Sequence, residues 1–148
     1  MLKDTLIKIF KNDLNKLKHE ITCYKNEANL WIIEKEVSNS AGNLCLHIIG
    51  NLNHFIGSVL GNTRYIRKRD LEFSLKNVSK LDLIKQIDDT IKVVEDTLNR
   101  LSINDLEKQY PITVYKEPMT TEYFLTYLTT HLVYHLGQIT YHRRLLDS

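Results

Sequence analysis

Proline and glycine are scarce in this sequence of 148 residues, which contains two prolines and five glycines. Both prolines lie within one short stretch, from Pro111 to Pro118. Because these residue types interrupt helices and strands most strongly, their scarcity favours long, continuous elements over a fold rich in tight turns. Together with the helical spacing of the apolar residues, it predicts an all-α protein.

Cysteine is also rare, and the two that are present, Cys23 and Cys45, lack the close spacing of metal-binding pairs. The sequence therefore does not describe a disulfide-rich scaffold, and it neither requires nor excludes a bond between these two residues. Hydrophobic residues make up 43% of the chain, which can supply a core without disulfides. A reducing, cytoplasmic location is the expectation.

No stretch approaches the roughly 18 uninterrupted apolar residues of a membrane span. The first residues alternate charged with apolar side chains, which is unlike a signal peptide. The formal net charge is only +2, and the one basic cluster, at residues 64–69, is followed directly by Asp70 and Glu72. We therefore expect neither a membrane nor a nucleic acid as a partner.

Four long segments have apolar residues spaced by three and four, which is typical of amphipathic helices. They cover residues 3–25, 41–60, 80–101 and 120–146. The buried stripe of the first segment is predicted to be Leu6, Phe10, Leu14, Leu17, Ile21 and Tyr24. Side-chain oxygens of Ser38, Asn39 and Ser40 can cap the second helix, and Thr120 and Thr121 can cap the fourth. The pattern predicts one domain, residues 1–148, folded as a four-helix bundle.

The connectors between these helices are long for a bundle. Residues 62–79 are predicted to form a polar loop. Residues 102–119 include YPITVYKEP, whose β-branched and aromatic side chains favour extended structure. The apolar cluster LWIIEKEV, at residues 30–37, is compatible with either a turn of helix or an extended connector.

Two of the predicted helices carry a line of polar residues on an otherwise apolar surface. These lines comprise Asn43, His47, Asn51, His54 and Ser58 in the second helix, and His131, His135, Gln138 and His142 in the fourth. Polar groups inside an apolar helix cost free energy unless each finds a partner. Two such lines facing each other would form a polar cleft within the bundle.

His131 and His135 lie one turn apart on the same helical face, so both imidazoles can bind one ion. His47 can supply a third nitrogen from the second helix. Three protein ligands leave positions open for water or substrate, which is the arrangement of a catalytic metal site. The alternative interpretation is that each histidine is a hydrogen-bonded core residue.

The remaining polar residues of the two lines are expected to surround the site. His54 and His142 each lie about two helical turns, or about 10 Å, from a candidate ligand, so they cannot bind the same ion. We expect them at the mouth of the site or in solvent, with Asn51 and Gln138 as neighbours of the ligands. Carboxylates are nearly absent from both lines, so neither Asp nor Glu is predicted as a general base.

Two segments of the sequence resemble the DinB superfamily of four-helix-bundle proteins: NSAGNLCLHIIGNLNHFIGSVLGNTRYIRKRDLEFS and THLVYHLGQITYHRRLL. The similarity is strongest to a branch with a His-x-x-Gly-Asn segment, here His47 to Asn51, and an Arg-Asp-x-Glu-Phe segment, here Arg69 to Phe73. The resemblance implies three histidine ligands, which fall on His47, His131 and His135. The superfamily includes metal-dependent thiol S-transferases, among them bacillithiol transferases, and a mycothiol-dependent maleylpyruvate isomerase.

The leading functional hypothesis is a metal-dependent transferase that activates a low-molecular-weight thiol for reaction with a small-molecule electrophile. Imidazole ligands suit zinc, nickel, cobalt or iron. The alternatives are a non-catalytic metal-binding or stress-response protein and a metal-dependent hydrolase.

The fourth predicted helix also carries more aromatic surface than one bundle seam requires, at Tyr123, Tyr127, Tyr134 and Tyr141. Aromatic residues are enriched in protein interfaces, so these tyrosines predict a homodimer. The alternative is a monomer in which they line the site or pack on the connectors.

Overall fold

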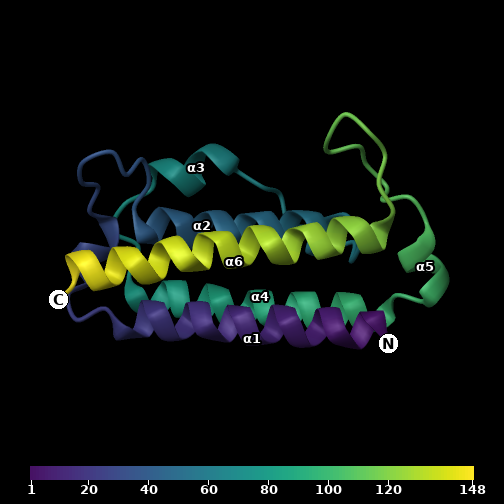
Figure 1. Ribbon diagram of the computed structural model, residues 1–148, viewed down its shortest axis with the longest axis horizontal. Coiled ribbons are helices and arrows are strands. Elements are labelled where there is room, and N and C mark those ends of the chain that lie inside the picture. The colour runs from purple at the N-terminus through teal and green to yellow at the C-terminus, as the bar shows by residue number, and fades with distance from the viewer.

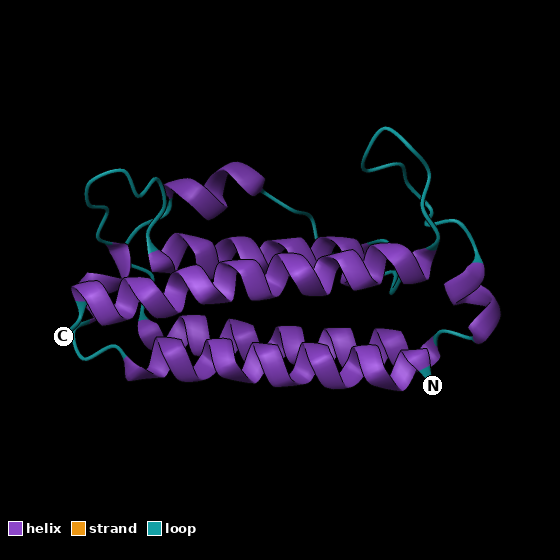
Figure 2. Ribbon diagram, in the orientation of Figure 1, coloured by secondary structure: helices purple, strands orange, loops and turns teal.

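The computed structural model describes residues 1–148 as helices joined by loops (Figures 1 and 2). The α-helices are α1 (Leu2–Cys23), α2 (Ala41–Leu52), α3 (Arg69–Ser74), α4 (Lys80–Arg100), α5 (Ile103–Glu107) and α6 (Thr121–Leu146). A short 3₁₀-helix, η1 (Glu27–Trp31), follows α1, and a π-helix, η2 (Asn53–Ser58), continues α2. No β-strand forms, and a single isolated bridge pairs Gln109 with Thr120. The all-α prediction is confirmed.

The four long helices α1, α2, α4 and α6 run lengthwise beside one another (Figure 1). Helix α1 packs against α4 and α6, while α2 packs against α6 and α4. The six predicted stripe residues of α1, from Leu6 to Tyr24, are all buried in one continuous hydrophobic core. Burying such side chains stabilises the fold by about 1.5–3 kcal/mol each, so this apolar spacing determines how the helices pack.

The helix starts agree with the predicted caps. The Ser40 hydroxyl accepts a hydrogen bond from the backbone N–H of Asn43, and the Thr120 hydroxyl accepts one from Tyr123. Such side-chain caps satisfy backbone donors that the first turn of a helix leaves free. They fix where α2 and α6 begin, and therefore which side chains face each other between these helices.

The second long helix departs from regular α-geometry after Leu52. The N–H groups of Val59 and Gly61 bond to the carbonyls of His54 and Ile56, five residues back. The Asn53 amide donates to the Ile49 carbonyl (2.8 Å), at the start of this wider turn. Because a π-turn advances each side chain by a smaller angle than an α-turn, the predicted polar line does not continue regularly to His54 and Ser58.

The connectors contain short helices that their sequences do not suggest. The predicted polar loop at residues 62–79 includes α3, which packs on α2 (Figure 1). Residues 102–119 begin with α5, and the bridge between Gln109 and Thr120 closes the irregular segment that follows. Residues 30–37 complete η1 and then continue without regular structure. No helix offers the length of apolar surface that a bilayer crossing would require.

Candidate metal centre

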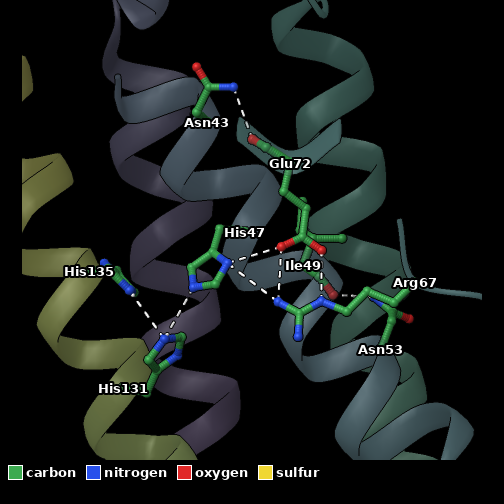
Figure 3. A network of polar contacts seen from close by, with 8 residues as sticks. All are labelled: Asn43, His47, Ile49, Asn53, Arg67, Glu72, His131 and His135. Carbon is green, nitrogen blue, oxygen red and sulfur yellow. Dashed lines mark hydrogen bonds and ion pairs between the residues drawn. The ribbon is translucent and has the colours of Figure 1, made fainter. Parts of the chain in front are cut away.

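Three histidines from two helices converge between α2 and α6 (Figure 3). The Nε2 atom of His131 lies 3.2 Å from Nε2 of His47 and 3.2 Å from Nε2 of His135. One ligand nitrogen from each of the three residues lies within 4.8 Å of the other two. We call this cluster the histidine triad; its side chains could hold a metal ion.

The two nitrogen–nitrogen distances from His131 suit ligands of a shared cation better than two simultaneous hydrogen bonds. With metal–nitrogen bonds of about 2.0–2.1 Å, neighbouring ligand nitrogens lie about 2.9 Å apart at a right angle and about 3.4 Å apart at a tetrahedral angle. The observed separations of 3.2 Å fall between these values. A ring nitrogen has one hydrogen or one lone pair, so His131 cannot hydrogen-bond well to both neighbours at once. The donor set therefore fits a divalent ion.

The orientation of His47 is fixed by a carboxylate behind it. Its Nδ1 lies 3.0 Å from Oε1 of Glu72, which comes from α3. A carboxylate accepts, so Nδ1 carries the proton and Nε2 keeps its lone pair toward the other two histidines. Carboxylate partners of this kind orient metal-binding histidines and strengthen them as donors.

Glu72 is itself held by an arginine. Arg67 donates from Nε to Oε2 and from Nη2 to Oε1, both at 2.9 Å (Figure 3). Burial by itself would raise the pKa of Glu72, but hydrogen bonds from His47 and Arg67 together lower it below the usual value. The carboxylate therefore stays ionised, as an acceptor for His47 requires.

Helix α3 is attached to α2 at two further points. The Asn43 amide donates to the backbone carbonyls of Glu72 (2.9 Å) and Leu75 (2.8 Å). Gly50, one turn along α2 from His47, leaves space for the carboxylate, because a Cβ at this position would collide with it. The Phe73 ring packs against the His47 ring with centroids 4.9 Å apart. The His-x-x-Gly-Asn and Arg-Asp-x-Glu-Phe segments thus meet at one site.

The other two ligands present neutral imidazoles. Nδ1 of His135 donates to Oε1 of Gln138 at 2.7 Å, which leaves Nε2 as the free acceptor. Burial lowers the pKa of His135, and the hydrogen bond to Gln138, which acts in the opposite direction, only partly offsets this effect. Burial, followed by the neighbouring His135 and His47, lowers the pKa of His131 to about 4. Both rings are therefore uncharged near neutral pH, the form that binds metals.

The other predicted site residues have different environments in the structure. Gln138 contacts His135 directly, whereas Asn51 is buried with its Oδ1 lacking any donor. His54 is half-buried, with its ring 4.8 Å from that of Phe55. Of the two positions expected for His142, the mouth of the site or solvent, the solvent position is wrong. It is buried, with Nδ1 2.6 Å from the Tyr24 hydroxyl and Nε2 2.9 Å from the Ile32 carbonyl.

Sequence analysis missed Glu72 and Arg67, both of which belong to the predicted polar loop. Neither residue lies on the polar lines of the two long helices, where the site was predicted. The Arg-Asp-x-Glu-Phe segment contained the relevant signal, because it places a glutamate after a basic cluster in a connector that follows the His47 helix. Only the packing of α3 on α2 brings this glutamate to His47.

A groove adjoins the triad at His135. Its volume is about 700 Å³, and its walls come from α6, from residues 34–39 and from Leu44 of α2. His135 and Gln138 lie at one part of the wall, and His142 lies further along α6. This volume is within the usual range for small-molecule sites.

An all-helical fold with three converging histidines thus defines a protein with a candidate metal centre. Residues 3–148 match the family described as "Protein of unknown function (DUF1572)", and the chain belongs to this family. The comparison with curated proteins finds no match.

His54 and His142, the two histidines near but outside the triad, allow effects on metal binding to be measured separately from effects on folding. Changing His54 or His142 to Gln should leave the metal content unchanged, because neither belongs to the triad. His142→Gln should nevertheless lower the free energy of unfolding of the metal-free protein by about 1–3 kcal/mol, since its two buried hydrogen bonds are disturbed. Elemental analysis and thermal unfolding measure the two effects. A drop in metal content in either variant would contradict the assignment.

Proposed function

We propose that the chain is a DinB-like four-helix-bundle protein that binds one divalent metal ion through His47, His131 and His135. Two features support this proposal. One ligand comes from the second long helix and a His-x-x-x-His pair from the last, as the DinB resemblance implies. The Nε2 atom of His131 also lies 3.2 Å from Nε2 of His47 and of His135, a distance that suits neighbouring ligands of one ion. Zinc, nickel, cobalt and iron all suit such ligands.

We further propose that the protein is a metal-dependent thiol S-transferase. The observation that carries this proposal is the groove, because it reaches a ligand of the triad and can admit a small molecule. A divalent ion at the triad would bind a thiol sulfur, lower the pKa of the thiol and keep it as a nucleophilic thiolate. Glu72 and Gln138 hold two of the imidazoles in place, and the groove walls position the rest of the substrate.

Hydrolysis is less well supported by the contacts of Glu72. In a metal-dependent hydrolase, a free carboxylate can accelerate the reaction by acting as a general base toward the attacking water. The carboxylate that reaches the triad, Glu72, is occupied on both oxygens by Arg67 and on Oε1 by His47. This arrangement suits an orienting role rather than proton transfer to a substrate.

The test is a screen of the protein loaded separately with zinc, nickel, cobalt and iron. Each form is incubated with several thiols and 1-chloro-2,4-dinitrobenzene, and with an activated ester in parallel. Thiol conjugation that requires both the metal and His131 supports the transferase. Ester cleavage without conjugation supports the hydrolase. Stoichiometric metal without either reaction supports the non-catalytic metal-binding protein.

We also propose a homodimer formed through α6. Tyr123, Tyr127, Tyr134 and Tyr141 are all exposed along one side of this helix, with the small residues Thr130 and Gly137 between them. In an antiparallel pair of α6 helices centred at residues 135 and 136, Tyr134 faces Gly137 of the partner subunit. Tyr141 then faces Thr130 of the partner subunit. Large side chains opposite small ones make this surface complementary to itself, as a two-fold interface requires.

Gly137→Ala should have opposite effects on the monomer and on the dimer. A Cβ at Gly137 would meet no atom within 4 Å of its own chain, so alanine should stabilise the helix by about 1 kcal/mol. In the proposed dimer the same Cβ approaches Tyr134 of the partner subunit and should weaken association. Light scattering across a dilution series, together with thermal unfolding, measures both effects. A monomer mass for the unchanged protein throughout the micromolar range would contradict the dimer.

A further inference from the structure

The groove beside His135 has the composition of a binding site for the body of a substrate. It runs along α6 from Tyr134 toward Leu146 and is closed on the other side by residues 34–39. It includes one ligand of the triad, His135, and the Gln138 that orients this ligand. A molecule that reaches the metal centre by this route therefore contacts the groove walls.

Much of the groove wall is apolar or aromatic. The side chains that give it this character are Val37, Leu44, Tyr134, Tyr141, Leu145 and Leu146. Leu145 is 74% exposed, and Tyr134 and Tyr141 are 65% and 68% exposed within one chain, although in the proposed dimer these two tyrosines also face the partner subunit. Exposed apolar side chains gathered around one hollow are typical of ligand-binding surfaces. Tyrosine rings also offer flat faces on which another ring can stack.

The charges in the groove disfavour an anionic ligand. Glu34 and Glu36 contribute two carboxylates and Lys35 one ammonium group, which gives these side chains a net charge of −1, apart from the ion that the triad would hold. No arginine is among the lining residues, although arginine is the side chain best suited to bind carboxylates and phosphates. Arg67, near the triad, has its donors directed to Glu72, and Arg69 lies over the Phe73 ring at 5.1 Å. Both arginines lie outside the groove.

We propose that this groove selects thiols whose body is apolar or aromatic and has no negative charge. The inference rests on the proposed thiol transferase function and assigns the substrate class of its site. It predicts that a thiol with a carboxylate near the sulfur is a poor ligand even though the metal centre would accept its sulfur. The apolar wall contributes affinity through burial, while Glu34 and Glu36 repel the anion.

The experiment uses the cobalt(II)-loaded protein, because a thiolate bound to cobalt(II) produces a strong near-ultraviolet absorption band. Benzyl mercaptan is titrated against 3-mercaptopropionate at the same pH and ionic strength. We expect benzyl mercaptan to bind at least about tenfold more tightly. The variant Glu36→Lys changes the groove charge from −1 to +1, so it should reduce this preference several-fold by strengthening 3-mercaptopropionate binding. Glu117→Lys, the same change at an exposed position outside the groove, should leave the preference unaltered.

The outcomes distinguish a failure of the proposed thiol selectivity from a failure of the proposed thiol transferase function. A thiolate band with equal affinities, or with tighter binding of 3-mercaptopropionate, overturns the selectivity and leaves thiol binding intact. A preference that Glu36→Lys and Glu117→Lys change equally shows that the groove is not its source, and also overturns the inference. The absence of a thiolate band with either thiol overturns the thiol transferase function, and the inference with it. Val37→Asp, a second groove variant, should weaken benzyl mercaptan binding if the assignment is correct.

Discussion

Replacing His47 by alanine is expected to reduce the bound metal from about one ion per chain to well below that value. The substitution removes one of three ligand nitrogens and leaves the Glu72 carboxylate without its acceptor role toward the triad. His131→Ala and His135→Ala should have the same result, because two imidazoles and solvent hold a divalent ion far less tightly than three imidazoles. Elemental analysis after dialysis against metal-free buffer measures the loss.

The control for this prediction is a histidine that lies outside the histidine triad. His19 is exposed on α1, and its ring makes a polar contact with Cys23, with Nε2 3.4 Å from Sγ. His19→Ala should keep the full metal content. If His47→Ala retained tight, stoichiometric binding, the triad would not be the metal site, and the proposed function would lose its basis.

The triad could be predicted from the sequence because its ligands lie on regular helices. Four-residue spacing places His131 and His135 on one face, and the long apolar pattern around His47 indicates a buried helix. The starts of the long helices could be predicted for the same reason, since their apolar stripes and side-chain caps are local features. Helical periodicity therefore predicts the positions of those residues that lie on regular helices.

The remainder of the site depends on tertiary contacts that no local pattern shows. Helix α3 is only six residues long, and its RDLEFS sequence is polar enough to suggest a solvated loop. Its position becomes evident only when Asn43 and Gly50 of α2 are seen to bind and accommodate Glu72. The π-turn after Leu52 likewise depends on the irregular bonding of residues 53–61, which the periodic pattern of the sequence does not reveal.

Gly50→Ala is expected to weaken metal binding about 10- to 100-fold, the range typical when the outer partner of a metal ligand is lost. A Cβ at this position would lie 2.5 Å from Cδ of Glu72, far inside van der Waals contact. The carboxylate must then move away from His47, which frees the imidazole to rotate and removes its orienting acceptor. Crowding of this buried contact should also lower the free energy of unfolding by about 1–3 kcal/mol. Competition with a metal chelator measures the affinity.

Two further variants identify the cause of that loss. Gly137→Ala makes the same chemical change on α6, close to His135 and Gln138, where the added Cβ meets nothing within its own chain. It should leave metal affinity unchanged and slightly stabilise the helix. Glu72→Gln keeps the shape of the side chain but removes its charge, so it should weaken metal binding without the crowding penalty. If Gly50→Ala and Glu72→Gln both bound metal as tightly as the unchanged protein, Glu72 would serve only to attach α3. The histidine triad would then act without its carboxylate partner.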